Sequence, residues 1–95
     1  IRPDPMIEGT VKIVNPLGLH ARAAAQLVRL AGTFESRIII ARTDEGIFAD
    51  AKSILSVLTL AAAFGSTLEL KVEGADAVTA YDAVRALFEN GFGEI

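Results

Sequence analysis

The sequence predicts an α+β fold of two layers, with helices packed on one face of a four-stranded, antiparallel or mixed sheet whose other face meets solvent. Periodicity is the first reason, because segments with the two-residue period of strands and the longer period of helices follow one another as β-α-β-β-α-β-α. Size is the second reason: 95 residues, 52% of them hydrophobic, are enough for one small core.

The first half of the chain has the pattern of a β-α-β unit that ends in a hairpin. Val11 and Ile13 alternate with polar residues, and Pro16 and Gly18 then predict a tight loop. Apolar residues at helical spacing follow, and Gly32 predicts the end of that helix. Two short apolar runs, the first of them β-branched, then indicate the strands of a hairpin. We expect a strand at residues 9–14, a loop at 15–18, a helix at 21–31 and the two strands of the hairpin at 36–41 and 46–49.

The second half continues the alternation. Apolar residues recur at helical spacing before Gly65, alternate with polar residues in the next segment, and return to helical spacing before Gly91. We expect a helix, a strand and a helix at residues 51–64, 67–73 and 75–90.

The first five residues are polar, contain two prolines and are excluded from the predicted fold. We interpret residues 1–5 as a remnant of expression or as a linker from a preceding domain, and Met6 as a natural start. Residues 6–95 are then the folded domain.

The composition disfavours several classes of protein. Without cysteine, disulfides, thiolate metal sites and cysteine nucleophiles are excluded, and the cytoplasm is the simplest location. With one histidine and no close cluster of carboxylates, we expect neither a metal site nor a cofactor. The net charge of -3 and the lack of tryptophan argue against nucleic acid. No apolar run approaches the ~20 residues that span a bilayer, so we expect no membrane insertion.

Charged residues are distributed unevenly. No Asp or Glu occurs between Gly9 and Phe34, and Lys52 is the only charged residue between Ala51 and Leu68. If the two helices predicted in these segments lie side by side, they form an apolar face with a positive rim. Such a face suits a phosphate group or an acidic partner.

His20, the lone histidine, is expected where the tight loop ends and the first helix begins. The positive end of the helix dipole favours a neutral, nucleophilic imidazole there and attracts anions. Arg22 can hold phosphate oxygens in a forked geometry, so the two residues suit the transfer of a phosphoryl group. The alternative is a structural histidine that caps the helix.

Three separated motifs carry a resemblance to a known family. They are Asn-Pro-Leu-Gly-Leu-His-Ala-Arg at 15–22, Lys-Ser-Ile-Leu at 52–55 and Leu-Phe-Glu-Asn-Gly-Phe-Gly at 87–93. From about Met6 to Glu94 the chain resembles the histidine-containing phosphocarrier (HPr) family of the bacterial phosphotransferase system. The resemblance implies an open-faced β-sandwich, with three helices on one face of a four-stranded antiparallel sheet. It also implies a carrier that accepts a phosphoryl group from Enzyme I and passes it to EIIA-type domains, in sugar transport or in a nitrogen-related branch.

The resemblance also implies that His20 is the residue that carries the phosphoryl group. We expect Arg22 to neutralise the phosphate, assisted by the backbone N–H groups of Ala21, Arg22 and Ala23. The family usually has proline at the position of Ala23, and many members have a small polar residue at the position of Leu17. The phosphate contacts of this chain are therefore expected to differ in detail.

Ser53 matches a serine that a dedicated HPr kinase/phosphorylase modifies in some branches of the family, which implies regulation. An ordinary helix cap is the alternative. Phosphorylation would add negative charge to the partner-facing surface and weaken docking to an acidic partner.

We expect partner proteins to bind an exposed apolar surface with a positive edge. The residues of this expected surface are Ala25, Arg29, Leu55 and Leu58. For Leu58, burial in the core is the alternative, because it belongs to the predicted core stripe of Ile54, Val57, Leu58 and Ala61. Phe92 is either a plug over the core or part of a frayed terminus, and we assign it no function.

Two other functions are alternatives to the phosphocarrier. A non-catalytic regulatory module would bind partners through the same face, but it would not need histidine at position 20. A small phosphatase would need a pocket and a second acid–base group, and the sequence places no such group near His20. We expect a monomer.

Overall fold

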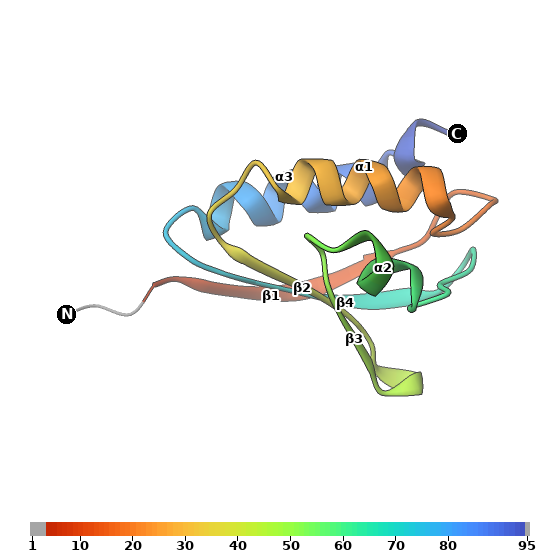
Figure 1. The fold of residues 1–95 in the computed structure, drawn as a ribbon, viewed down its shortest axis with the longest axis horizontal. Helices are drawn as coiled ribbons and strands as arrows, with labels where there is room; N and C mark the ends of the chain where they lie inside the picture. The colour runs from red at the N-terminus through yellow and green to blue at the C-terminus, as the bar shows by residue number, and fades with distance from the viewer. Residues whose placement is uncertain (1–3, 95) are drawn as a thin grey trace.

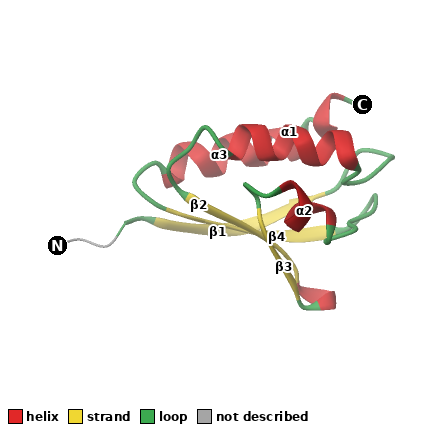
Figure 2. Ribbon diagram, viewed as in Figure 1, coloured by secondary structure: helices red, strands yellow, loops and turns green. Residues whose placement is uncertain are grey.

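The structure, a computed structural model, describes residues 4–94. They form the predicted elements in the predicted order (Figure 1). Figure 2 shows that the helices cover one face of the sheet and leave the other open, which confirms the two-layer, open-faced sandwich. The elements are β1 (Met6–Lys12), α1 (Ala21–Ala31), β2 (Arg37–Arg42), β3 (Ile47–Asp50), α2 (Ile54–Leu58), β4 (Thr67–Glu73) and α3 (Ala77–Glu89), with 3₁₀ turns at Thr43–Glu45 and Gly91–Gly93.

The four-stranded sheet has the order β1-β4-β2-β3, and every neighbouring pair is antiparallel. At one end of the sheet, Lys12 of β1 pairs with Thr67 of β4. At the other end, Glu73 of β4 lies between Met6 of β1 and Arg37 of β2. We call the end at Lys12 and Thr67 the site end and the end at Glu73 the distal end.

The core lies between the sheet and the helices. Alternation along β4 places Leu68, Leu70 and Val72 against the helices, fully buried, and polar residues on the open face. Leu27 of α1 and Phe88 of α3 are also fully buried. Truncating a fully buried leucine to alanine typically costs ~2–5 kcal/mol, so this layer contributes much of the stability.

The first strand, Met6–Lys12, begins and ends earlier than the predicted range 9–14. Its ladder with β4 ends at the Lys12–Thr67 pair, because β4 begins there. Ile13 is nevertheless fully buried, and its backbone bonds to Ser66 O at 2.9 Å and to Gly65 N at 2.8 Å. The apolar alternation therefore predicted burial correctly but placed the strand about three residues too late.

The second helix is much shorter than the predicted range 51–64, since α2 contains only five residues. Its C-terminal extension is replaced by a loop in which Ala61 has a left-handed backbone with φ of 46°. Arg42 Nη1 donates to Leu60 O at 3.0 Å and to Ala61 O at 3.3 Å, which stabilises this turn. The predicted core stripe is accordingly wrong in part: Val57 is fully buried, whereas Ile54, Leu58 and Ala61 are exposed.

Residues 1–3 of the excluded segment and Ile95 lie outside the described residues. The carbonyl of Pro5 accepts a hydrogen bond from Gly74 N at 3.0 Å. The loop before α1, the loop between α2 and β4 and the C-terminal turn gather at the site end (Figure 1). None of the helices within residues 4–94 has the length and apolar character needed to cross a membrane.

Candidate functional site

His20 is the N-cap residue of α1, as predicted, with an extended backbone (φ -74°, ψ 178°). The first intrahelical hydrogen bond at this end runs from Ala24 N to His20 O at 2.8 Å. The N–H groups of Ala21, Arg22 and Ala23 therefore have no partner within the helix, and no side chain caps them. They form the polar, anion-attracting start of an 11-residue helix.

A tight turn, closed by a hydrogen bond from Gly18 N to Asn15 O at 3.1 Å, presents His20. Gly18 has a φ of +69°, and a Cβ at this position would lie 2.6 Å from Ala62 O. Only glycine fits both the left-handed backbone and this close approach. Leu19 N donates to Ala62 O at 2.9 Å, so the turn is fixed to the loop that follows α2.

Glu94 is the residue that sequence reasoning missed. His20 Nε2 is hydrogen-bonded to Glu94 Oε2, and Asn15 Nδ2 donates to Glu94 Oε1 at 3.0 Å and to Gly18 O at 2.7 Å. Asn15 is fully buried, and its Oδ1 has no partner among residues 4–94. A buried amide with an unused acceptor costs stability, whereas the two hydrogen bonds from its Nδ2 connect the turn before α1 to Glu94.

Phe92 holds Glu94 in place. Its side chain is buried and packs edge-to-face on Phe88 with ring centroids 5.0 Å apart, so it is a plug over the core and not part of a frayed end. Its backbone is left-handed (φ 55°) and turns the chain toward the loop before α1. The motif Gly91-Phe92-Gly93 was the sequence signal for this turn, but it did not indicate where the next carboxylate would point.

The surroundings of the Glu94 carboxylate favour its ionised form. The hydrogen bond from Asn15 lowers its pKa most, partial burial raises it, and the His20 hydrogen bond and the charges of His20 and Arg22 lower it further. Its net pKa is below the ordinary value. The uneven distribution of charge along the sequence did not indicate this contact, in which a carboxylate 74 residues away in the chain touches the ring.

The contact with Glu94 distinguishes the two ring nitrogens. In a neutral imidazole one nitrogen carries the proton and the other the lone pair. With Nε2–H donating to the carboxylate, the lone pair lies on Nδ1, for which the described residues provide no hydrogen-bond partner. The arrangement can therefore offer Nδ1 as a nucleophile.

Arg22 is exposed on the first turn of α1. Within residues 4–94 its guanidinium forms no hydrogen bond or ion pair, although it is near enough to Glu94 to lower the carboxyl pKa. Its five donors are thus available to an arriving anion.

Ser53 is the N-cap of α2, and its hydroxyl accepts a hydrogen bond from Ser56 N at 3.4 Å. The capping role is confirmed. Ser53 is half-buried, and α2 is too short to supply a strong dipole to a phosphate there.

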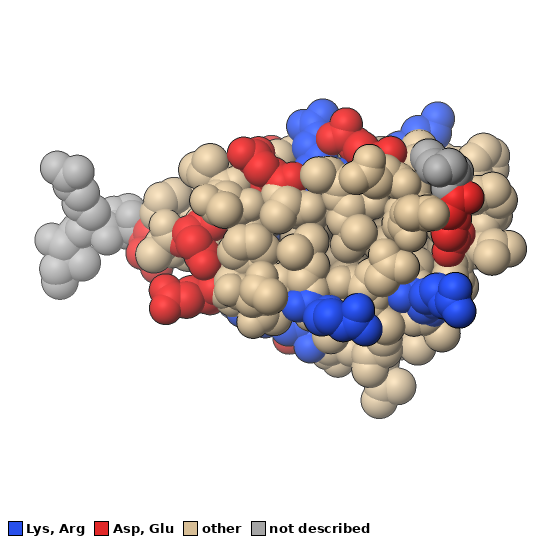
Figure 3. Space-filling view, turned by 90° about the horizontal axis from the view of Figure 1, so that it is seen from above, with Lys and Arg blue, Asp and Glu red and all other residues tan. Residues whose placement is uncertain are grey.

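The helices α1 and α2 pack side by side, as expected from the sequence. Of the expected partner surface, Leu55 is 74% exposed, Leu58 36% exposed, Arg29 exposed and Ala25 half-buried. Figure 3 shows the helix-covered face, which is largely uncharged in its middle and carries charged side chains toward its margins.

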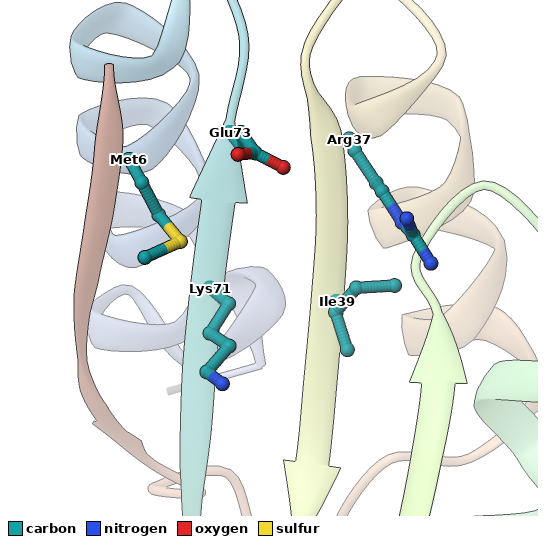
Figure 4. Close-up of a pocket in the computed structure, with 5 residues that line it drawn as sticks. All are labelled: Met6, Arg37, Ile39, Lys71 and Glu73. Carbon is teal, nitrogen blue, oxygen red and sulfur yellow. The ribbon is translucent and has the colours of Figure 1, made fainter. Parts of the chain in front are cut away.

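A shallow pocket of about 200 Å³ lies on the open face of the sheet. It is lined by Met6, Arg37, Ile39, Lys71 and Glu73 at the distal end, away from His20. Figure 4 shows that the Arg37 side chain extends toward β3 and the Lys71 side chain runs along β4. Because these cationic groups do not converge, the pocket does not form an anion site.

Known proteins match nearly the whole chain. The family model described as "PTS HPr component phosphorylation site" matches residues 7–90. The phosphocarrier protein HPr of Cupriavidus necator is 47% identical over 89 residues, which cover 94% of this chain and 98% of that protein. The phosphocarrier protein NPr of Proteus mirabilis is 43% identical over 84 residues, with coverage of 88% and 92%.

The fold matches solved structures of the same kind. A crystal structure of HPr from Thermoanaerobacter tengcongensis superposes with a TM-score of 0.86 at 37% identity, covering 94% of this chain and 98% of the other. Together with the sequence matches, this likeness shows that the chain belongs to the HPr family of phosphocarriers of the phosphotransferase system.

Proposed function

We propose that His20 accepts a phosphoryl group from Enzyme I and passes it to an EIIA-type domain. The observation that carries the proposal is the hydrogen bond between His20 Nε2 and the ionised Glu94, which leaves Nδ1 as the free nucleophile at the start of α1. Membership of the HPr family supports the same assignment.

The transfer needs no group beyond those of this chain and the donor. The Nδ1 lone pair attacks phosphorus, a P–N bond forms, and the bond from phosphorus to the donor breaks with its electron pair going to the donor. The ring, still protonated at Nε2, becomes cationic, and Glu94 stabilises this charge through their hydrogen bond. In the second half-reaction a nucleophile of the acceptor attacks phosphorus, and Nδ1 leaves with the electron pair as a neutral imidazole.

The start of α1 supplies positive partial charge to the phosphoryl oxygens. We assign this role to Arg22 and to the N–H groups of Ala21, Arg22 and Ala23, which have no partner within the helix. With alanine in place of the proline usual in the family, position 23 keeps an N–H group that can donate. Arg22 also offsets the repulsion between Glu94 and the incoming phosphate.

Partner proteins, in this proposal, cover His20 and the neighbouring parts of α1 and α2. Leu55 is the best candidate for an apolar contact, because a leucine that is 74% exposed next to a reactive group gains most from being covered. Leu58, Ala25 and Arg29 complete this surface. Exchange in the cytoplasm as a monomer is part of the proposal.

Phosphorylation of Ser53 by an HPr kinase/phosphorylase is a further part of the proposal. The hydroxyl already caps α2 through a long, 3.4 Å hydrogen bond, so modification would cost the fold little. The added charge would lie beside Leu55 and reduce docking of an acidic partner. Ser53→Asp should therefore slow charging by Enzyme I while the melting temperature stays nearly unchanged.

The decisive experiment is incubation of the chain with phosphoenolpyruvate, magnesium and Enzyme I, followed by mass spectrometry. We expect an acid-labile gain of one phosphoryl group that is absent in His20→Ala, and nitrogen-15 NMR should assign it to Nδ1. Arg37→Gln at the distal end is the control and should be charged at the wild-type rate. If the wild type stays uncharged while a known HPr is charged in the same tube, the proposal fails.

A further inference from the structure

Arg42, the last residue of β2, has a guanidinium in which every nitrogen has a partner. Nη1 donates to Leu60 O at 3.0 Å and to Ala61 O at 3.3 Å. Nε lies 3.3 Å from Asp44 Oδ1, and Nη2 lies 3.8 Å from Glu45 Oε1. The guanidinium therefore joins the turn after β2 to the loop between α2 and β4.

The loop between α2 and β4 in turn contacts the residues that carry His20. The carbonyl groups of Leu60 and Ala61 accept from Arg42, and the next one, Ala62 O, accepts from Leu19 N at 2.9 Å. Leu19 directly precedes His20 in the chain. The place of the Ala62 carbonyl thus helps to fix the backbone from which His20 begins α1.

Local preference alone does not give this loop its shape. Ala61 is left-handed with φ of 46°, a conformation that alanine disfavours because of its Cβ. Such a residue persists only where its surroundings impose the conformation. The surroundings of Ala61 are the two hydrogen bonds from Arg42 and the burial of Leu60 and Ala62 on either side. Without Arg42, we expect the turn at Ala61 to relax and the Ala62 carbonyl to move with it.

We propose that Arg42 is a positioning residue for phosphoryl transfer, which fixes the place of His20 through the loop between α2 and β4. This inference rests on the proposed function. In-line attack on phosphorus depends on the placement of the nucleophile, and a misplacement of about 1 Å can cost a factor of roughly 100. Because Asn15 and Glu94 also hold the turn and the ring of His20, the loss of Arg42 should have a smaller effect than this.

The same strand offers a matched control. Arg37 is the first residue of β2 and Arg42 the last, and Arg37 pairs with Glu73 at the distal end. Replacing either arginine by methionine keeps an apolar stem and removes the charge and all five donors. Arg42→Met and Arg37→Met therefore make the same chemical change at opposite ends of one strand.

The test is rapid-quench charging of each variant by phosphorylated Enzyme I over a range of concentrations. Arg42→Met should lower the maximal rate of transfer about fivefold and leave the half-saturating concentration unchanged, because the nucleophile is misplaced after the partners have bound. Arg37→Met should change neither quantity. Arg42→Lys is the second variant if Arg42→Met does not fold. A lysine cannot reproduce the fork of the guanidinium, so the maximal rate should fall about twofold.

Two further measurements separate positioning from general stabilisation. Hydrogen exchange of the Leu19 N–H should accelerate in Arg42→Met more than exchange of the Leu70 N–H in the central strand β4, which reports opening of the whole sheet. Addition of Ala61→Gly to Arg42→Met should restore most of the lost rate, since glycine adopts the left-handed turn without support. Addition of Ala63→Gly, in the same loop but without a positive φ, should not.

A maximal rate of Arg42→Met equal to that of the wild type would overturn the inference, as would equal acceleration of exchange at Leu19 and Leu70. Equal rescue by the two glycine substitutions would also overturn it, because Arg42 would then not act through the turn at Ala61. In each of these cases, charging of the wild type on His20 would still support the proposed function. A wild type that Enzyme I does not charge would refute both.

Discussion

The two ends of the sheet are each organised around one carboxylate, and the two carboxylates have different consequences. At the distal end, Asp76 accepts hydrogen bonds from Glu35 N and Ser36 N at 2.9 Å and from the Ser36 hydroxyl. At the site end, Glu94 accepts from the Asn15 amide and from His20. Both have a pKa below the ordinary value.

The difference lies in the donors. The Ser36 hydroxyl and two backbone N–H groups have no chemistry left once they donate to Asp76, so that cluster only ties two loops together. The imidazole that donates to Glu94 has a second nitrogen, and fixing the first nitrogen leaves the second with a lone pair. Similar hydrogen bonding thus yields a structural clip at one end and a candidate nucleophile at the other.

The largest effect is expected from replacing the glycine that each end of the sheet requires, Gly74 at the distal end and Gly18 at the site end. Gly74 has a φ of +153°, and a Cβ there would lie 2.6 Å from the Cα of Ser36. Gly74→Ala should therefore lower the free energy of unfolding by roughly 3 kcal/mol, from backbone strain and overpacking. Gly18→Ala should cost a similar amount, because of its φ of +69° and the 2.6 Å approach to Ala62 O.

The two glycine variants should differ in function. Below their melting temperatures, Gly74→Ala should be charged by Enzyme I at the wild-type rate, whereas Gly18→Ala should be charged more slowly because His20 moves with the turn. Urea unfolding and charging rates measured on the same samples check both statements. Equal charging of the two variants would show that the turn at Gly18 does not position His20.

A second, smaller effect is expected from neutralising each of the two carboxylates, Glu94 and Asp76. Glu94→Gln keeps an acceptor near Nε2 but removes the negative charge, so the rate of charging should fall about tenfold through weaker stabilisation of the cationic ring. Asp76→Asn is the matched change at the distal end. It should lower the melting temperature and leave the rate of charging unaltered.

Rapid-quench measurement of charging, together with thermal unfolding, tests this pair. A charging rate of Glu94→Gln equal to that of the wild type would mean that Glu94 is structural like Asp76. The two ends of the sheet would then differ in their loops and not in the role of their carboxylates.

Acidification should reduce the stabilisation that Asp76 and Glu94 provide at the two ends of the sheet. Because the pKa values of Asp76 and Glu94 are lower in the folded chain than in the unfolded chain, the unfolded chain binds more protons at acid pH. Their stabilisation is complete above the ordinary carboxyl pKa values of about 4–4.5 and is lost as the pH falls through the lower, folded values. The free energy of unfolding should therefore decline below about pH 4.5, and less steeply in Asp76→Asn and in Glu94→Gln. Urea titrations from pH 7 to 2.5 measure this slope, and unchanged slopes in both variants would contradict the assigned causes.

Local patterns predicted most of the fold. The range 67–73 for β4 agrees with the structure at both ends, α1 ends just before Gly32, and His20 begins α1. These features depend on alternation, helical spacing and turn residues that lie within a few positions of one another. The antiparallel order of the sheet agrees with the two-layer arrangement inferred from the element order.

Two features could not be predicted because their causes are not local. Glu94 reaches His20 only because Phe92 is buried against Phe88 and turns the chain back, which depends on packing of the finished core. The second helix ends early, at Leu58, where the residue types give no stop signal, and Arg42 from β2 holds the turn that follows at Leu60 and Ala61. Both lie at the site end, where the chain departs most from local preference.

The smallest expected effect is a change in stability when the unfavourable backbone conformation of Ala61 is relieved. At the distal end the positive φ at position 74 is occupied by glycine, whereas at the site end Ala61 adopts a left-handed backbone with φ of 46°. A left-handed non-glycine residue costs ~1–2 kcal/mol, and glycine loses about 0.5–1 kcal/mol through the greater entropy of the unfolded chain. Ala61→Gly should therefore stabilise the fold by up to about 1 kcal/mol.

Ala63→Gly is the control for this substitution, because Ala63 is exposed in the same loop and lacks a positive φ. It should be slightly destabilising, so the two alanine-to-glycine changes should shift the urea midpoint in opposite directions. Shifts of the same sign would mean that Ala61 stores no strain. In that case the early end of α2 would have to be attributed to the hydrogen bonds from Arg42 alone, and Arg42→Gln, with those bonds removed, should then allow the helix to extend toward residue 64.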